Sequence, residues 1–331
     1  MTLHHRRRPF RILSAACRTA AVAVGAAAVL AAAPAPPAPP ARVPPGEPVL
    51  SARTNLVVLP VTVTGHHGRF VPDLTKADFA VYDNGVRQPI QFFRSADAPV
   101  TVGLVIDNSG SMQTKLPSVI SAATVFAQTS NPLDQIFIVN FDEHVSMGLP
   151  PDVPFTSRIA QLETALDSVS ARGMTALYDA IDAALHHLTL GTRDRRVLLV
   201  ISDGGDDASR TTKQQALAAA ERSNAVIYTV GLFDQYDDER DPGVLKQFAR
   251  VTGGEAFFPH RITGAARACK QIARIIRSGY TIGYTPTGVG TNDGHHTIEV
   301  VLLGDVARYG YRVVTRPGYF AGRPPAAPEA P

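Results

Sequence analysis

The sequence predicts an α/β fold in which a doubly wound, mainly parallel sheet is inserted in a small all-β sandwich-like domain. Between residues 99 and 278, short apolar runs alternate with amphipathic segments, the order of strands and helices in a parallel sheet covered by helices. The apolar runs are nearly continuous in Val, Leu and Ile, as in strands that are buried on both faces. On either side of this region the pattern changes to alternating strands and turn signals, which predicts β structure.

Residues 1–33 have the features of a signal peptide. They begin with a basic stretch and continue with an apolar segment from about Thr19 to Ala33, which ends in small residues suited to cleavage. An uncleaved membrane anchor is the alternative, but roughly 15 apolar residues are fewer than the ~20 that span a bilayer. Arg7 and Arg8 leave open whether export uses the general or the twin-arginine route. We expect an exported chain, periplasmic or extracellular, without a stable membrane span once it is mature.

The composition is that of a chain with a substantial packed core. Of its 331 residues, 45% are hydrophobic and 18% are charged. The formal net charge is +3, but residues 1–33 contain five arginines and no acidic residue, which leaves 27 basic and 29 acidic residues and a net charge of −2. This balance does not indicate nucleic acid or an anionic membrane as a partner. Loss of Cys17 with the signal leaves Cys269 without an intramolecular partner, so the fold must be stable without a disulfide.

Four further segments follow from local composition and pattern. Residues 34–49 form a Pro/Ala-rich linker, and residues 321–331 form a similar tail that we expect to be disordered. Residues 99–278 form the inserted α/β domain. Because residues 50–98 and 279–320 are each too short to fold alone, we expect them to pair as one discontinuous β domain.

The elements of both domains can be placed in chain order. A period of two in residues 55–64 predicts a strand, and Asn84-Gly85 predicts a hairpin between two further strands. In the α/β region the candidate strands end at Ile106, Phe141, Ser202, Gly231 and Phe258. Apolar residues at positions i, i+3, i+4 and i+7 predict helices that include residues 119–126, 181–188 and 265–272. Strand patterns return between Tyr280 and Tyr319.

Three loops that follow predicted strands carry oxygen-bearing side chains. The first loop runs from Asp107 to Ser111, the second contains Gly173-Met174-Thr175, and the third runs from Ser202 to Asp207. In open parallel sheets, ligands bind beyond the carboxyl ends of the strands, where such loops gather. Carboxylates and hydroxyls without His or Cys suit a hard cation such as Mg²⁺, Mn²⁺ or Ca²⁺ and argue against zinc or copper.

The spacing of the first loop predicts how these side chains meet. Asp107, Ser109 and Ser111 are two residues apart, so a loop that turns over after the strand directs them to one point, and Thr175 and Asp203 close the ring from neighbouring loops. Without a cation the two carboxylates repel each other and one tends to protonate. We therefore predict these five residues as metal ligands, with a ligand-binding rim formed by Asn108, Gly110, Met112, Gly173, Met174, Gly204 and Asp206.

These residues resemble the metal-ion-dependent adhesion site (MIDAS) of the von Willebrand factor type A (VWA) domain family. The family pattern is DxSxS in the first loop, a Thr in the second and an Asp in the third, and this sequence matches all five positions. The flanks are similar to the bacterial VWFA-related group in DLTKADFAVYDNGVRQPIQFF, GMTALYDAI, YTIGYTP and RPGYF, so the resemblance covers about residues 50 to 322.

The resemblance implies a VWA/Rossmann-like sheet and a metal-assisted protein-binding module. In that family the serine hydroxyls coordinate the ion directly, the threonine does so directly or through water, and the aspartates often do so through water. Because neutral oxygens leave the ion short of negative charge, an Asp or Glu carboxylate of a partner protein is an attractive further ligand.

Some of these residues have other interpretations. Asp107 and Ser109 could serve only as caps of the helix that begins near Lys115, but capping does not require Asp203 and Thr175. Asp206 and Asp207 either extend the metal site or are solvated loop charges. The acidic residues between 234 and 241 lack the spacing of an EF-hand loop. Cys269 is expected to be a buried, inert thiol, and the histidines are expected at the surface: His144, His186, His187, His295 and His296.

Catalysis is disfavoured because the motifs that it requires are missing. The serines lack SxxK or GxSxG surroundings, a haloacid-type loop needs Asp where Ser109 stands, and there is no GxxxxGK. We therefore predict no catalytic residues and an exported, divalent-metal-dependent adhesion or scaffold module. The alternative is a structural or assembly component of the cell envelope that binds partners through a metal-independent surface.

Overall fold

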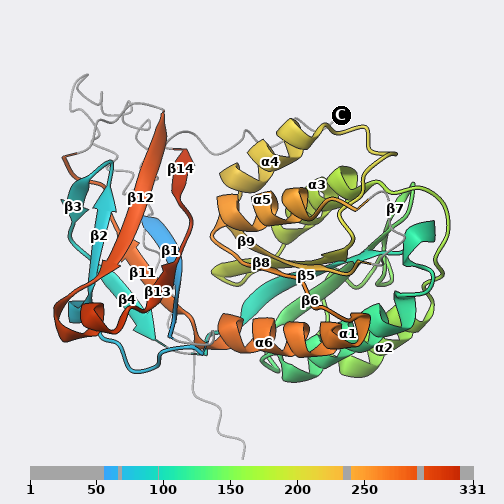
Figure 1. The fold of residues 1–331 in the computed structure, drawn as a ribbon, viewed down its shortest axis with the longest axis horizontal. Helices are drawn as coiled ribbons and strands as arrows, with labels where there is room; N and C mark the ends of the chain where they lie inside the picture. The colour runs from blue at the N-terminus through green and yellow to red at the C-terminus, as the bar shows by residue number, and fades with distance from the viewer. Residues whose placement is uncertain (1–55, 66–68, 96, 234–239, 289–293, 321–331) are drawn as a thin grey trace, which may run out of the picture. The chain divides into compact units, whose positions relative to one another are not determined.

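The computed structural model describes residues 56–65, 69–95, 97–233, 240–288 and 294–320. Its central sheet has six strands in the order β10-β9-β8-β5-β6-β7 (Figure 1). The edge strand β7 (Val145–Met147) is antiparallel to β6, and the others are parallel. The parallel strands are β5 (Val100–Asp107), β6 (Gln135–Phe141), β8 (Arg195–Ser202), β9 (Ala225–Gly231) and β10 (Ala256–Phe257).

Helices cover both faces of this sheet, with α1, α2 and α6 on one face and α3, α4 and α5 on the other (Figure 1). The predicted fold class, a mainly parallel sheet with helices together with antiparallel sheets, is therefore confirmed. Three helices, α2, α4 and α5, were not predicted. The bounds of the six helices are α1 (Leu116–Thr129), α2 (Ile159–Asp167), α3 (Leu177–Leu188), α4 (Lys213–Arg222), α5 (Pro242–Thr252) and α6 (Ala265–Ser278).

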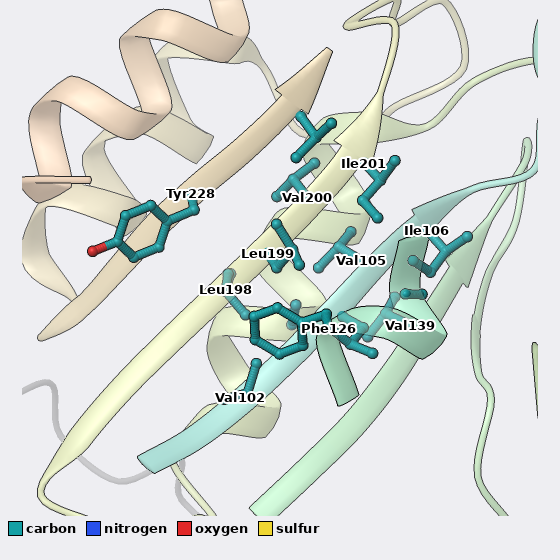
Figure 2. Close-up of a cluster of buried hydrophobic side chains, with 14 of the residues drawn as sticks. Val102, Val105, Ile106, Phe126, Val139, Leu198, Leu199, Val200, Ile201 and Tyr228 are labelled. Carbon is teal, nitrogen blue, oxygen red and sulfur yellow. The ribbon is translucent and has the colours of Figure 1, made fainter. Parts of the chain in front are cut away.

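The core of the α/β region is built from the strands and the apolar faces of the helices. Val102 and Val105 of β5, Val139 of β6 and Phe126 of α1 all belong to this buried cluster (Figure 2). Every residue of β5 is buried, as expected for a central strand. Gly103 of β5 is tightly enclosed, because a Cβ atom there would lie 2.5 Å from the Phe137 ring. Close packing on both faces thus holds the ends of β5 and its neighbours in place.

The chain reverses direction within the sheet between β5 and β8. From β5 it crosses to β6 on one side, and it later returns to β8, β9 and β10 on the other. The loops after β5 and β8 therefore separate at this point instead of covering the same helix layer. Such a topological switch point is where ligands bind in open α/β sheets.

Strands from both flanks of the chain form two antiparallel four-stranded sheets, in the orders β13-β1-β11-β4 and β14-β12-β2-β3. N-terminal and C-terminal strands pair directly: β1 and β4 with β11, and β2 with β12. Apolar residues of both sheets pack in one core, which is a sandwich arrangement. The bounds are β1 (Val57–Thr64), β2 (Phe79–Asp83), β3 (Val86–Gln88), β4 (Phe92–Ser95), β11 (Tyr280–Tyr284), β12 (His295–Leu302), β13 (Arg312–Val314) and β14 (Gly318–Phe320).

The β2–β3 connection is the hairpin that the sequence predicts. Asn84 and Gly85 have φ angles of 47° and 77°, the left-handed conformations that a two-residue type I′ turn requires. The turn fixes the register in which Asp83 is opposite Val86. Asp83 itself points into the sandwich core.

Asp83 is the centre of a buried polar cluster. Its side chain is fully buried and accepts hydrogen bonds from the Tyr284 hydroxyl and the Tyr319 hydroxyl, both at 2.9 Å, and from Nδ1 of His296 at 2.7 Å. The prediction that His296 lies at the surface is wrong, because His296 is only 4% exposed. The period of two in β12 places it on the same inward face as Ile298 and Val300.

The two phenols of this cluster predict a loss of stability at alkaline pH. Burial, followed by contact with Asp83, raises the pKa of Tyr284 and of Tyr319 above the ordinary value of 10.0. A raised pKa in the folded state contributes stability below the unfolded pKa, and this contribution is lost as pH rises toward the folded pKa. We therefore expect the free energy of unfolding, measured with urea, to fall as the pH rises above about 10, by up to ~1.4 kcal/mol per pH unit for each phenol.

A pair of variants tests this assignment. Tyr284→Phe removes one titrating group and should make the alkaline slope shallower. Tyr309→Phe, at a side chain that is 59% exposed, is the matched control and should leave the slope unchanged. Equal slopes in the wild-type chain and in Tyr284→Phe would contradict the role given to Tyr284.

Cys269, the cysteine within the described residues, is buried as predicted. Cys269 lies on α6, is fully buried and has no disulfide partner. Burial raises the pKa of its thiol to about 12. The thiol is therefore part of the apolar packing and is not a reactive group.

Candidate metal centre

The carboxyl ends of β5 and β8 carry the two carboxylates of the candidate site. Asp107 is the last residue of β5, and Asp203 directly follows β8. In the sheet, Ile106 pairs with Ile201, so the two strands end side by side. Asp107 is fully buried and Asp203 is 1% exposed. The site therefore lies at the topological switch point described above.

The first loop brings its three predicted ligands together. Asp107 Oδ1 accepts hydrogen bonds from the backbone N–H of Ser109 at 3.0 Å and from its hydroxyl at 2.6 Å. The hydroxyls of Ser109 and Ser111 are 3.1 Å apart. A single 3₁₀ turn, Gly110–Met112, follows Ser109 and produces this arrangement. Residues two apart thus converge, as the sequence predicts.

Asp203 joins this group from the third loop. The Ser111 hydroxyl donates to Asp203 Oδ2 at 2.7 Å, so short contacts connect Asp107, Ser109, Ser111 and Asp203 in one continuous series. Ser202 donates from its hydroxyl to Asp107 Oδ2 at 2.6 Å, which ties the end of β8 to the end of β5. Four of the five predicted ligands are therefore assembled by hydrogen bonds between side chains.

Thr175 is placed by its backbone. Its side chain is almost fully buried, and its N–H donates to Asp207 Oδ1 at 2.7 Å. The second loop is also bound to the first, since Gly110 N–H donates to the Gly173 carbonyl at 3.0 Å. Within the described ranges, no hydrogen bond joins the Thr175 hydroxyl to the other four ligands. Its role as a ligand remains a prediction.

The rim residues divide into exposed and buried groups. Gly110, Gly173 and Met174 are exposed and Asp206 is half-buried, as a rim requires. Asn108 and Gly204 are buried. Met112, predicted for the rim, is fully buried in the core of the α/β region, because the 3₁₀ turn directs it beneath the loop.

Asn108 Oδ1 is buried and accepts no hydrogen bond from the described residues, so a water or an ion could satisfy it.

Asp206 and Asp207 hold the second and third loops together. Asp206 Oδ1 accepts from the N–H of Tyr178 and from the hydroxyl of Ser209, and Asp207 accepts from Thr175 as given above. Asp207 is exposed, as the interpretation as a loop charge expects, and both carboxylates also make specific hydrogen bonds. The two carboxylates are cross-links that orient the start of α3 and Thr175, two residues before it.

Three residues of the site were missed by sequence reasoning. Lys115 is 1% exposed and donates from Nζ to Asp203 Oδ2 at 3.0 Å and to the Leu232 carbonyl at 3.1 Å. Ser202 binds Asp107, and Glu143 accepts from the Met174 N–H at 2.8 Å. A lysine directly before a helix is usually solvated, so the sequence contains no sign that this one turns inward.

The simple capping interpretation of the first loop does not hold. The residue before α1 is Lys115, and no side chain caps this helix N-terminus by a hydrogen bond. Asp107 and Ser109 instead bond to each other. In addition, Asp107 accepts from Ser202, and the Ser109 hydroxyl contacts that of Ser111. Their positions are therefore not explained by the needs of α1.

The electrostatics of the site are those of two buried carboxylates with one internal cation. Burial, and secondly the charge of Asp203, raises the pKa of Asp107 to about 7. The contribution of Asp203 is the like-charge repulsion that the sequence predicts for the pair. Lys115 compensates one of the two charges through its ion pair with Asp203.

The donor set fits a hard divalent cation. It consists of carboxylate and hydroxyl oxygens and includes no sulfur or imidazole. In the described ranges no three His, Cys, Asp or Glu side chains gather as a metal site, and the candidate site itself contributes only two carboxylates. Most of the acidic segment considered as a second calcium site, residues 234–239, lies outside the described residues.

A parallel α/β sheet with a DxSxS loop at its switch point defines the class to which this region belongs. Residues 102–205 match the family model of the von Willebrand factor type A domain. No curated protein matches the sequence.

In the part of the chain that the structure describes, no helix has the length and apolar character needed to cross a membrane.

Solved structures with the same fold include a von Willebrand factor type A protein from Catenulispora acidiphila. It has 14% sequence identity and a TM-score of 0.50, and the match covers 75% of this chain and 74% of that chain. The vWF domain of the type V pili tip protein Mfa5 from Porphyromonas gingivalis has 15% identity and a TM-score of 0.45, with 55% and 96% covered. BatB from Bacteroides thetaiotaomicron has 19% identity and a TM-score of 0.43, with 54% and 100% covered. At 14% identity the likeness to the Catenulispora acidiphila protein concerns the fold alone.

Proposed function

We propose that the chain is an exported protein-binding module of the adhesion or scaffold type, without catalytic residues of its own. In this proposal a divalent cation, Mg²⁺ or alternatively Mn²⁺ or Ca²⁺, is held by Asp107, Ser109, Ser111, Thr175 and Asp203, and an Asp or Glu carboxylate of a partner protein completes it. The single observation that carries the proposal is the continuous series of short oxygen contacts from Asp107 to Asp203 at the switch point.

The chemistry of these oxygens explains why a partner carboxylate is needed. Three of the five proposed ligands are neutral hydroxyls, which supply electron pairs but no charge. A bound dication would therefore keep unsatisfied positive charge toward the exposed rim residues Gly110, Gly173 and Met174. A carboxylate, with two acceptor oxygens and a full negative charge, is the protein group best suited to that position.

Two glycines of the rim, Gly110 and Gly173, are exposed to solvent. Gly110 and Gly173 have no side chains, and their backbones are joined by a hydrogen bond of 3.0 Å. Gly173 has a φ of 71° and lies so close to the Glu143 carboxylate that an added Cβ would collide with it. The left-handed backbone favours glycine at this position, and the Glu143 carboxylate, which also accepts from the Met174 N–H, lies against this part of the rim.

One observation favours the alternative function, binding through a metal-independent surface. The ammonium of Lys115 already pairs with Asp203, so the site has an internal cation before any metal is added. In that case the α/β domain would act as a structural component of the envelope, and its partners would be insensitive to chelators.

Capture of partners under two ionic conditions separates the two functions. The immobilised chain would be incubated with envelope proteins of the host in Mg²⁺ and, in parallel, in excess EDTA. We expect retained proteins to be lost in EDTA and also with the Asp107→Ala variant in Mg²⁺. Retention that survives both treatments would overturn the metal-dependent proposal in favour of the alternative.

A further inference from the structure

The only lysine that the described residues bury is Lys115, at the centre of the candidate site. Its side chain is 1% exposed, and its ammonium lies 3.0 Å from Asp203 Oδ2. A second contact of 3.1 Å, to the carbonyl of Leu232, holds the ammonium from the other side. Since Leu232 follows β9, Lys115 links the first loop to the ends of both β8 and β9.

A lysine at position 115 is electrostatically unfavourable for the N-terminus of α1. It is the residue immediately before α1, where the helix N-terminus carries partial positive charge and an acidic or neutral capping residue is preferred. Removing an ammonium from water is also costly unless a carboxylate and further acceptors receive it. Neither the helix nor the apolar core explains the choice of lysine, whereas Asp203 does.

We propose that Lys115 is a built-in cation of the metal site, which shares Asp203 with the divalent ion, lowers the affinity for that ion and selects for an anionic partner. This inference rests on the proposed metal-dependent function. It assigns to Lys115 a specificity-determining role that differs from that of a ligand, because an ammonium has no lone pair for a metal.

The net charge of the site predicts how Lys115 affects the affinity for a dication. Asp107 and Asp203, when ionised, together with Lys115, have a net charge of −1 before metal is bound. A dication changes this to +1, whereas the same site without the ammonium would be neutral when loaded. Lys115 therefore repels the incoming dication but leaves a loaded site that attracts a carboxylate.

The ammonium also orients Asp203 within the site. Asp203 Oδ2 receives both the Ser111 hydroxyl and the Lys115 ammonium, so its charge is compensated and its orientation is fixed. A preformed site of this kind does not need the ion to bring its loops together.

The test compares Mg²⁺ binding by the wild-type chain and by Lys115→Met, which keeps the length of the side chain and removes its charge. Titration calorimetry at about pH 8, where carboxylates are ionised, should give a dissociation constant at least about tenfold lower for Lys115→Met. The melting temperature should also rise more on addition of Mg²⁺ in the variant than in the wild-type chain. Lys270→Met, at an exposed position on α6, is the matched control and should bind as the wild-type chain does.

Each outcome separates the inference from the proposed function. Tighter binding by Lys115→Met supports the inference, even if the wild-type chain binds no Mg²⁺, in which case only the proposed metal dependence fails. Equal or weaker binding by the variant overturns the inference and leaves a metal-binding wild-type site in place. Failure of both proteins to bind overturns both.

A measurement on the wild-type chain covers the case in which Lys115→Met does not fold. A buried, hydrogen-bonded ammonium exchanges its protons slowly, so Lys115 should give a lysine side-chain ¹⁵N signal that the exposed lysines do not. Mg²⁺ is expected to shift this signal at the same concentrations at which it binds. A signal that does not move while Mg²⁺ binds would show that Lys115 does not share the site.

Discussion

Asp107→Asn is expected to weaken Mg²⁺ binding by on the order of 100-fold or more, as measured by titration calorimetry, because it removes one of only two negative charges from the proposed donor set. Loss of a group that merely orients a metal ligand already costs about 10- to 100-fold in affinity. A directly coordinating or water-bridging carboxylate should cost at least the upper end of that range.

The same substitution should leave the fold intact. An asparagine Oδ1 can still accept from the N–H and hydroxyl of Ser109, and its amide can donate to the Ser202 hydroxyl, which accepts as well as donates. Removing one of two repelling carboxylates offsets any remaining loss. We expect the free energy of unfolding to change by less than about 1 kcal/mol.

Asp152→Asn is the control for the change in charge. Asp152 is exposed on the loop before α2, and its replacement should not alter Mg²⁺ affinity. If Asp107→Asn retained wild-type affinity, Asp107 would not be part of a metal site, and the oxygen cluster would have only a structural role.

The second large effect is expected at Asp83, in the sandwich core. Asp83→Asn should lower the free energy of unfolding by about 1–3 kcal/mol, the cost of leaving a buried hydrogen-bonding group without its partner. Two tyrosine hydroxyls donate to Asp83 Oδ2 and His296 donates to Oδ1, so an amide nitrogen on either side would face a donor. At least one buried donor is left without an acceptor.

An exposed acidic residue of the same β region is the matched control. Asp305 pairs with Arg308 at 3.5 Å, and both side chains are more than four-fifths exposed. Such a pair contributes little in water, so Asp305→Asn should change the free energy of unfolding by less than about 0.5 kcal/mol. Urea unfolding of both variants is the measurement, and equal effects would contradict the role of Asp83 as a buried anchor.

Much of the fold could be read from the sequence because burial on both faces leaves a direct signature. β5, β6, β8 and β9 are nearly unbroken apolar runs, and α1, α3 and α6 carry their apolar residues at helical spacing. α4 was missed because the residues it buries are Ala216 and Ala220, whose small side chains give a weak periodic signal. Its start could have been recognised from the capping box of Thr212 and Gln215.

For the candidate site, the sequence predicts convergence of the first loop but not its surroundings. The spacing of Asp107, Ser109 and Ser111 is local, and the hydrogen bonds among them follow from one turn of chain. Asp206 and Asp207 illustrate the limit, because their partners lie about thirty residues earlier in the chain, at the start of α3. Local spacing contains no information on such contacts.

The sequence by itself determined the order of strands and helices, the oxygen-rich character of three loops and the absence of soft metal ligands, because these depend on side-chain type and spacing. Only the tertiary structure decided that Lys115 turns inward to Asp203, that His296 is buried against Asp83 and that Met112 lies in the core. The physical reason is that charge pairing and burial depend on which distant segments meet, and a buried ion pair is stable only where both partners and their remaining hydrogen bonds are brought together by packing.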